Sequence, residues 1–147
     1  MGKLAKWLRM MGYDTLFFNG PDDSNMIATA LTERRVILTR DAEIMKRRVV
    51  TSGKLKAIHI KSERPEQQIR QVVNTLNLDH DFRPFTLCLE CNQPLVMRTK
   101  EEVRDRVPPY VFQTQREYVE CPVCHRIYWK GTHWQAMVKT IKEFVES

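Results

Sequence analysis

The four cysteines are the residues whose types and spacing most directly indicate chemistry. Cys88 and Cys91 form one Cys-x-x-Cys pair, and Cys121 and Cys124 form a second. Two thiolates three positions apart on a tight turn can face one cation, and two such turns complete a tetrahedral shell for Zn²⁺. The alternatives are disulfides, which belong to secreted chains, and a redox site, which needs a single pair near a βαβ unit. We therefore predict a structural zinc ribbon.

Acidic residues occur where two apolar runs end. Asp41 follows the run at residues 36–39, and Asp22 and Asp23 follow the run at residues 13–18. In an open parallel sheet, ligands bind beyond the carboxyl ends of the strands. Carboxylates that converge there suit Mg²⁺ or Mn²⁺. An aspartate at a helix start is also a common N-cap, and this second interpretation stays open.

The positive charge lies mainly in the first part of the chain. The net charge is +6, and residues 1–80 hold 14 Lys and Arg against 9 Asp and Glu. A basic surplus favours polyanionic partners and fast encounter with them. A solvated basic surface without such a partner is the alternative. Acidic metal ligands within a basic surround are the arrangement expected of a metal-dependent nuclease.

Apolar periodicity predicts an α/β first part. Apolar residues recur at helical spacing over residues 3–11, and Gly12 ends that helix. The other expected elements alternate between strand and helix, which is typical of a parallel sheet with helices against it. They are strands at 13–18, 36–39 and 55–60, and helices at 22–34, 41–50 and from 65 onward.

The alternation breaks at residues 79–86, where we place a domain boundary. We therefore predict an α/β domain over residues 1–80 and a zinc ribbon with a C-terminal helix over residues 81–147. In the second part we expect a capping box at Thr99 and Glu102 that begins a short helix, and a final helix capped by Thr132. The short strands expected there are near 95–97, 110–112, 118–120 and 127–129.

The composition excludes several classes of protein. Hydrophobic residues make up 42% of the chain, which supports a packed core, but no apolar run is as long as a membrane helix. The N-terminus has no signal-peptide core, so we expect a cytoplasmic protein without a membrane partner. Nucleophile elbows, Walker loops and dinucleotide-binding turns are absent from the sequence.

Four sequence segments together resemble the Mut-seven C-terminal RNase domain family. These segments are Gly-Lys-Leu-Ala-Lys-Trp-Leu-Arg-Met-Met-Gly-Tyr-Asp at 2–14, Leu-Thr-Arg-Asp at 38–41, Arg-Val-Pro-Pro at 106–109 and Tyr-Trp-Lys-Gly-Thr-His-Trp at 128–134. The resemblance covers nearly the whole chain. It implies a PIN-like nuclease fold followed by a zinc ribbon, and hydrolysis of single-stranded RNA with Mg²⁺ or Mn²⁺.

The resemblance also implies roles for particular residues. Asp41 matches the aspartate of the Thr-Arg-Asp motif, and Asp23 matches the acidic residue that opens the next helix in related sequences; with Asp22 they are the expected Mg²⁺ or Mn²⁺ ligands. The four cysteines match the ribbon ligands. We expect basic side chains of the first part to contact RNA, namely Lys3, Lys6, Arg9, Arg40 and Arg47.

In one respect the sequence departs from the family pattern. PIN-like members begin with a short apolar strand that ends in an aspartate, directly before the Gly-Lys-Leu helix, and this sequence begins at Met1-Gly2. Without that strand we expect impaired cleavage, and a preceding segment would restore the site. The alternative function is a non-catalytic module that binds RNA, the ribosome or another RNA–protein complex.

Overall fold

The structure is a computed structural model that describes residues 1–18, 22–79, 83 and 85–146. The contacts divide the chain into two compact units. We call residues 17–78 the parallel-sheet unit, and residues 1–16 together with 79–147 the cysteine unit. The first 16 residues thus group with the cysteines, whereas the sequence-based division placed them with residues 17–80. The division into domains at residues 1–80 and 81–147 stays a prediction.

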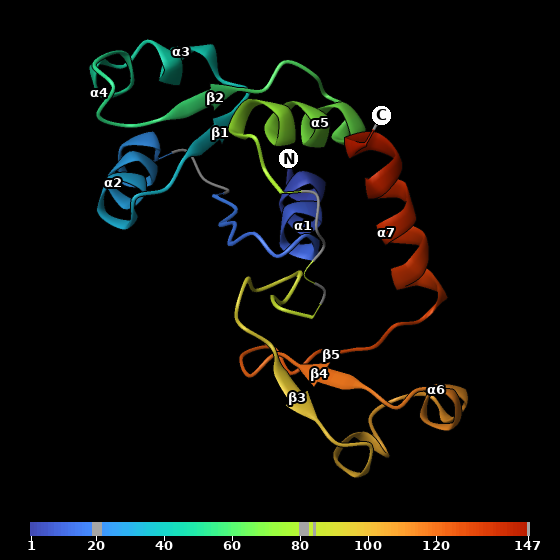
Figure 1. Cartoon of the computed structure of the whole chain (residues 1–147). Helices are drawn as coiled ribbons and strands as arrows, with labels where there is room; N and C mark the ends of the chain where they lie inside the picture. Colours follow the sequence, from blue (N-terminus) through green and yellow to red (C-terminus); the bar gives the residue numbers. More distant parts are fainter. Residues whose placement is uncertain (19–21, 80–82, 84, 147) are drawn as a thin grey trace. The chain divides into compact units, whose positions relative to one another are not determined.

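The described residues of the parallel-sheet unit form two short parallel strands and four helices. Strand β1 (Ile37–Thr39) pairs with β2 (Ala57–His59), with Thr39 opposite His59. Figure 1 shows the two strands side by side, with α2 close to β1. The helices are α2 (Asp23–Glu33), α3 (Ala42–Met45), α4 (Arg48–Thr51) and α5 (Pro65–Leu76).

A small apolar core holds α2 against this sheet. Ile27 and Ala30 of α2 are buried together with Ile37 of β1 and Leu55, which precedes β2. The side chains on α2 lie three positions apart, so they share one face of the helix. Helix α5 begins at Pro65 as predicted and buries an apolar stripe that includes Ile69, Val72 and Val73. The predicted α/β character of this part is confirmed.

The cysteine unit joins the first helix to an antiparallel sheet and the last helix. Its helices are α1 (Gly2–Met10), the 3₁₀ turn η1 (Glu101–Val103), α6 (Pro109–Thr114) and α7 (Thr132–Val145). Its strands β3 (Val96–Arg98), β4 (Tyr118–Glu120) and β5 (Ile127–Tyr128) form one sheet in that order. The three strands lie together in Figure 1. Tyr118, Val103, Val107 and Val111 form the apolar core beside this sheet.

Four sequence-based expectations about elements were wrong. Residues 13–18 form no strand, and residues 110–112 lie in α6, where Pro109 occupies the first helical turn. The helix expected over 41–50 is two single turns, α3 and α4, because Arg47 between them is extended. Gly131, and not Thr132, is the N-cap of α7. The predicted capping box is confirmed, since the backbone N–H groups of Thr99 and Glu102 each bond to the other residue's side chain.

Helix α2 ends with a residue in a conformation that suits glycine. Arg34 is the C-cap with φ 57° and ψ 50°, in the left-handed region that costs a non-glycine residue about 1 kcal/mol. We expect Arg34→Gly to raise the free energy of unfolding by about 0.5–1 kcal/mol in urea denaturation. Thr32→Gly, inside the same helix, is the matched control and should lower it by about 0.5 kcal/mol. A loss of stability in Arg34→Gly would contradict this account of the cap.

Candidate functional site

The four cysteines meet in one place. The sulfurs of Cys88, Cys91, Cys121 and Cys124 all lie within 4.8 Å of one another. Cys88 and Cys121 are fully buried, whereas Cys91 and Cys124 are partly exposed. All four are free thiols in the structure. Residues about 30 positions apart in the sequence therefore converge on a volume the size of one metal ion with its ligands.

Two matching turns bring the sulfurs together. In the first knuckle (residues 88–93), Cys88 N donates to Gln93 O and Asn92 N donates to Cys88 O, at 2.9 and 2.8 Å. In the second knuckle (residues 121–126), the same pair of bonds joins Cys121 to Arg126 and His125, both at 2.9 Å. The turns can close in this way because Asn92 and His125 have φ angles of 60° and 63°. Asparagine and histidine adopt this left-handed conformation more readily than most side chains.

Polar groups lie within hydrogen-bonding distance of the two buried sulfurs. The N–H of Cys91 donates to Cys88 Sγ, and the N–H groups of Val123 and Cys124 donate to Cys121 Sγ, each at 3.4 Å. The hydroxyl of Tyr128 lies 3.2 Å from Cys88 Sγ. Such contacts orient the sulfurs, which is the role of the outer shell in metal sites.

The thiols influence one another's ionisation. Burial opposes ionisation of Cys124, but bonds from the backbone and side chain of Arg126 outweigh it and lower the pKa of Cys124 to about 6. The hydrogen bond of Cys91 with Cys124 raises the pKa of Cys91 to about 12, and burial adds to the effect. One sulfur of this pair therefore ionises while its neighbour keeps a proton. A cation bound between the sulfurs would favour the thiolate form at every position, so that both sulfurs of the pair could be ionised together.

The donor set fits a metal such as zinc. Four sulfurs are soft ligands, they are enough for a closed tetrahedral shell, and two of them are shielded from solvent. Within the described residues this is the one group of three or more His, Cys, Asp or Glu side chains that could hold an ion.

Helix α1 is bonded to the first knuckle. Arg9 is 7% exposed, and its guanidinium donates to Leu89 O at 2.6 Å and to Thr15 O at 2.8 Å. Lys6 Nζ lies 2.8 Å from the carboxylate of Glu90. Burial lowers the pKa of Arg9, and the nearby Cys88 and Glu90 oppose the shift. The predicted RNA contacts Lys6 and Arg9 thus hold the cysteine unit together, and Arg9 has little surface left for a phosphate.

The side chain of Asn92 makes a second connection to the N-terminal segment. Its Oδ1 accepts a bond from Thr15 N at 3.0 Å, and its Nδ2 donates to Asp14 Oδ1 at 2.5 Å. The N–H of Thr15 bonds to Asn92 and its carbonyl oxygen accepts from Arg9, so both backbone groups of this residue are used by side chains and are not available for sheet pairing. The Gly-Lys-Leu helix and Asp14 of the family-like segment therefore serve the first knuckle.

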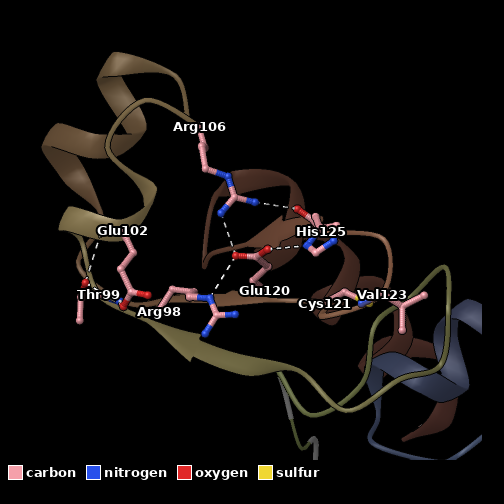
Figure 2. Close-up of polar contacts among 8 residues, drawn as sticks. All are labelled: Arg98, Thr99, Glu102, Arg106, Glu120, Cys121, Val123 and His125. Carbon is pink, nitrogen blue, oxygen red and sulfur yellow. Dashed lines mark hydrogen bonds and ion pairs between the residues drawn. The ribbon is translucent and has the colours of Figure 1, made fainter.

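A buried carboxylate supports the second knuckle. Glu120 precedes Cys121 and is 4% exposed. Its Oε1 accepts bonds from Arg98 Nε at 3.1 Å and Arg106 Nη1 at 2.8 Å, and its Oε2 lies 3.0 Å from His125 Nδ1 (Figure 2). Arg106 also donates to His125 O at 3.2 Å. The hydrogen bond from Arg106 is the main cause that lowers the pKa of Glu120 to about 2.

The predicted acidic ligands lie in the parallel-sheet unit. Asp22 and Asp41 are the N-caps of α2 and α3, where each accepts a backbone bond through Oδ1, from Asn25 N and Glu43 N respectively. Asp23 is the first residue of α2. The three aspartates do not form a ligand group of the kind that the cysteines form, within the residues that the structure describes. Asp22 and Asp41 are therefore helix caps, as the second interpretation of these residues predicted. In each cap bond, one of the two carboxylate oxygens is the acceptor.

The remaining predicted RNA contacts are surface residues. Lys3 Nζ lies 5.3 Å from the ring centre of Trp7, and Arg40 Nη2 lies 3.5 Å from Glu63 Oε1. Arg47 is exposed at the N-cap of α4. Sequence reasoning missed the roles of Asn92 and His125. Their signal was available, because each directly follows the second cysteine of its pair, where a knuckle needs a positive φ.

The fold and the site together define a small mixed α/β protein with a cluster of four cysteines that could hold a metal such as zinc. A family model matches the chain over residues 1–141, and its description is the Mut7-C RNAse domain. The chain therefore belongs to that family, which indicates a nuclease-like or RNA-related function. No match was found among curated proteins or among solved structures. Along the described part of the chain, the helices are too short or too polar to cross a bilayer.

Glu120 gives a testable account of how the second knuckle is stabilised. Its pKa is lower in the folded chain than the ordinary value of 4.5, so its contribution is present above pH 4.5 and is lost as the pH falls towards about 2. We expect Glu120→Gln to lower the free energy of unfolding by about 2 kcal/mol at pH 7, because Arg98 and Arg106 lose their anionic partner. Urea denaturation of both chains at pH 7 and pH 3 measures the difference, which should shrink at pH 3.

The matched control for this prediction is Glu101→Gln. Glu101 also pairs with an arginine, Arg104, at 2.7 Å, but its side chain is 72% exposed. Solvent screens an exposed pair, so this variant should change stability by less than about 0.5 kcal/mol. Equal effects of the two substitutions would contradict the importance of burial at Glu120.

Proposed function

We propose that this chain is a ribonuclease that hydrolyses single-stranded RNA, with Mg²⁺ or Mn²⁺ as its catalytic ion. The family match over residues 1–141 carries the proposal. The basic surplus of residues 1–80 supports it, because RNA is a polyanion that such a surface attracts. Lys3, Lys6, Arg40 and Arg47 are the proposed contacts to the phosphate backbone.

The proposed catalytic residues are Asp23 and Asp41, with Asp22 beside them. Asp41 follows β1 at the carboxyl end of the sheet, which is where open parallel sheets place their ligands. The described residues supply no set of three carboxylates for the ion. Mg²⁺ is commonly held by one or two carboxylates together with substrate phosphates, so Asp23 and Asp41 would depend on RNA to complete the shell. When bound, such an ion neutralises charge on the reacting phosphate.

The cysteine centre has a structural role in this proposal. Four sulfur ligands complete the tetrahedral shell of Zn²⁺, and no ligand position remains for a water or a substrate. Arg9 of α1 bonds to Leu89 in the first knuckle, and Glu120 of the antiparallel sheet contacts His125 in the second. Order in the cysteine centre therefore stabilises α1 and this sheet. PIN-like character of the parallel-sheet unit is likewise part of the proposal, and it follows from the family resemblance.

Asp41→Asn tests the catalytic assignment. Asparagine also caps helices, so the fold should persist while the charge is lost. We expect the rate of cleavage of a single-stranded RNA in Mn²⁺ to fall by about 100-fold or more. Glu43→Gln, a neighbouring exposed carboxylate that pairs with Lys46, is the matched control and should retain wild-type activity. Undiminished cleavage by Asp41→Asn would remove Asp41 from the mechanism.

The same assay distinguishes catalysis from binding alone. A wild-type chain that shifts RNA in a salt-dependent manner, yet never cleaves it, would identify a non-catalytic RNA-binding module. Affinity in that case should fall steeply as salt increases, because phosphate contacts release counterions.

Metal removal tests the structural assignment of the cysteines. We expect elemental analysis to find zinc bound to the purified chain, and we expect a strong chelator to abolish hydrogen-exchange protection over residues 85–133. Protection in α1 should fall as well, because Lys6 and Arg9 bond to the first knuckle. Protection in α5, in the other unit, serves as the internal control. Exchange rates that ignore the chelator throughout would show that the cysteines need no ion.

A further inference from the structure

The carboxyl edge of the parallel sheet holds a histidine that the proposed mechanism does not yet use. Strands β1 and β2 run parallel with Thr39 opposite His59, so both chains leave the sheet at the same edge. Arg40 and Asp41 follow β1, while Ile60 and Lys61 follow β2. His59 is thus the ionisable side chain nearest in register to the Thr-Arg-Asp segment, and it is partly exposed to solvent.

The ring of His59 is held in one orientation. Its Nε2 lies 3.1 Å from the carbonyl oxygen of Arg40, the residue directly before Asp41. A carbonyl oxygen only accepts hydrogen bonds, so in this contact Nε2 carries the hydrogen. The other ring nitrogen, Nδ1, then has a lone pair that can take up a proton.

The backbone beneath the ring is fixed as well. Gln71 of α5 donates through Nε2 to His59 O at 2.8 Å and accepts through Oε1 from Lys61 N at 3.0 Å. Ile60 N donates to Thr39 O at 2.7 Å, and the Thr39 hydroxyl accepts from Asp41 N at 3.0 Å. These bonds join the ends of both strands. A proton acceptor on such a rigid frame keeps its position relative to Asp41, as acid–base catalysis requires.

The charges at this edge suit a phosphate diester. Arg40 and Lys61 are exposed cations that follow the two strands directly, and Glu63 offsets part of their charge through its contact with Arg40. An RNA backbone drawn to this edge would bring a phosphorus atom close to both Asp41 and His59.

We propose that His59 is a further catalytic residue, the general base that accepts a proton through Nδ1 from the water that attacks the phosphorus. The inference rests on the proposed ribonuclease function. As the water oxygen forms its bond to phosphorus, one of its protons passes to Nδ1. The bond between phosphorus and the leaving oxygen breaks, and that oxygen keeps the electron pair and takes a proton from solvent. The imidazolium then returns its proton to solvent.

His59→Gln tests this role while it preserves the fold. The glutamine amide can replace Nε2 as the donor to Arg40 O, but it cannot accept a proton. On a single-stranded RNA under the conditions that support wild-type cleavage, we expect kcat to fall about 100-fold with KM within about twofold of wild type. We expect His59→Ala to lose activity too, and added imidazole to restore part of it. His133→Gln, an exposed histidine in the cysteine unit, is the control and should cleave normally.

The outcomes separate this inference from the proposed function. Wild-type kcat in His59→Gln, together with an inactive Asp41→Asn, would overturn the role of His59 and leave the ribonuclease assignment standing. A loss of activity in His59→Ala that imidazole does not relieve, with a lowered melting temperature, would show a purely structural histidine. Absence of cleavage by the wild-type chain would overturn both.

Discussion

The close approach of four sulfurs is the constraint on which the cysteine unit depends. Sulfurs that lie within 4.8 Å of one another repel when they are ionised together. The chain offsets this repulsion with backbone donors to Cys88 and Cys121 and with the cations of Arg9 and Arg126. A bound ion such as zinc would supply the rest. Helix α1 is ordered against the first knuckle by the same charges, so its position follows from the cysteines.

The two knuckles have the same backbone but use it for different purposes. The residue after the second cysteine must take a positive φ, and in many turns a glycine would serve. Here Asn92 uses its amide to bind Asp14 and Thr15, while His125 places its ring beside Glu120. Each side chain thus links its knuckle to a different neighbour, α1 in one case and the antiparallel sheet in the other. A glycine at either position would relieve backbone strain and lose that link.

Sequence reasoning succeeded where one local rule decided the outcome. Cysteine spacing predicted the four-sulfur group, and apolar periodicity predicted α1, α2, α5 and α7. Sequence reasoning failed where contacts with residues far away in the sequence determine the local structure. Residues 13–18 have strand-like composition, yet the backbone N–H of Thr15 bonds to Asn92, 77 positions away. Residues 110–112 lie in a helix that Pro109 begins and that buries Val111 against Tyr118. The contact of Glu120 with Arg98 likewise arises only once β3 pairs with β4.

A closed sulfur shell also bears on where chemistry can occur. Four protein ligands leave no position on a zinc ion for water or phosphate, so the cysteine centre cannot itself activate a nucleophile. Catalysis by a member of this family therefore needs other side chains. The carboxyl ends of β1 and β2 lie at the same edge of the sheet, where Asp41 follows β1 and where the His59 ring of β2 contacts Arg40 O. Because one oxygen of Asp41 caps α3, the position of this carboxylate is tied to that short helix.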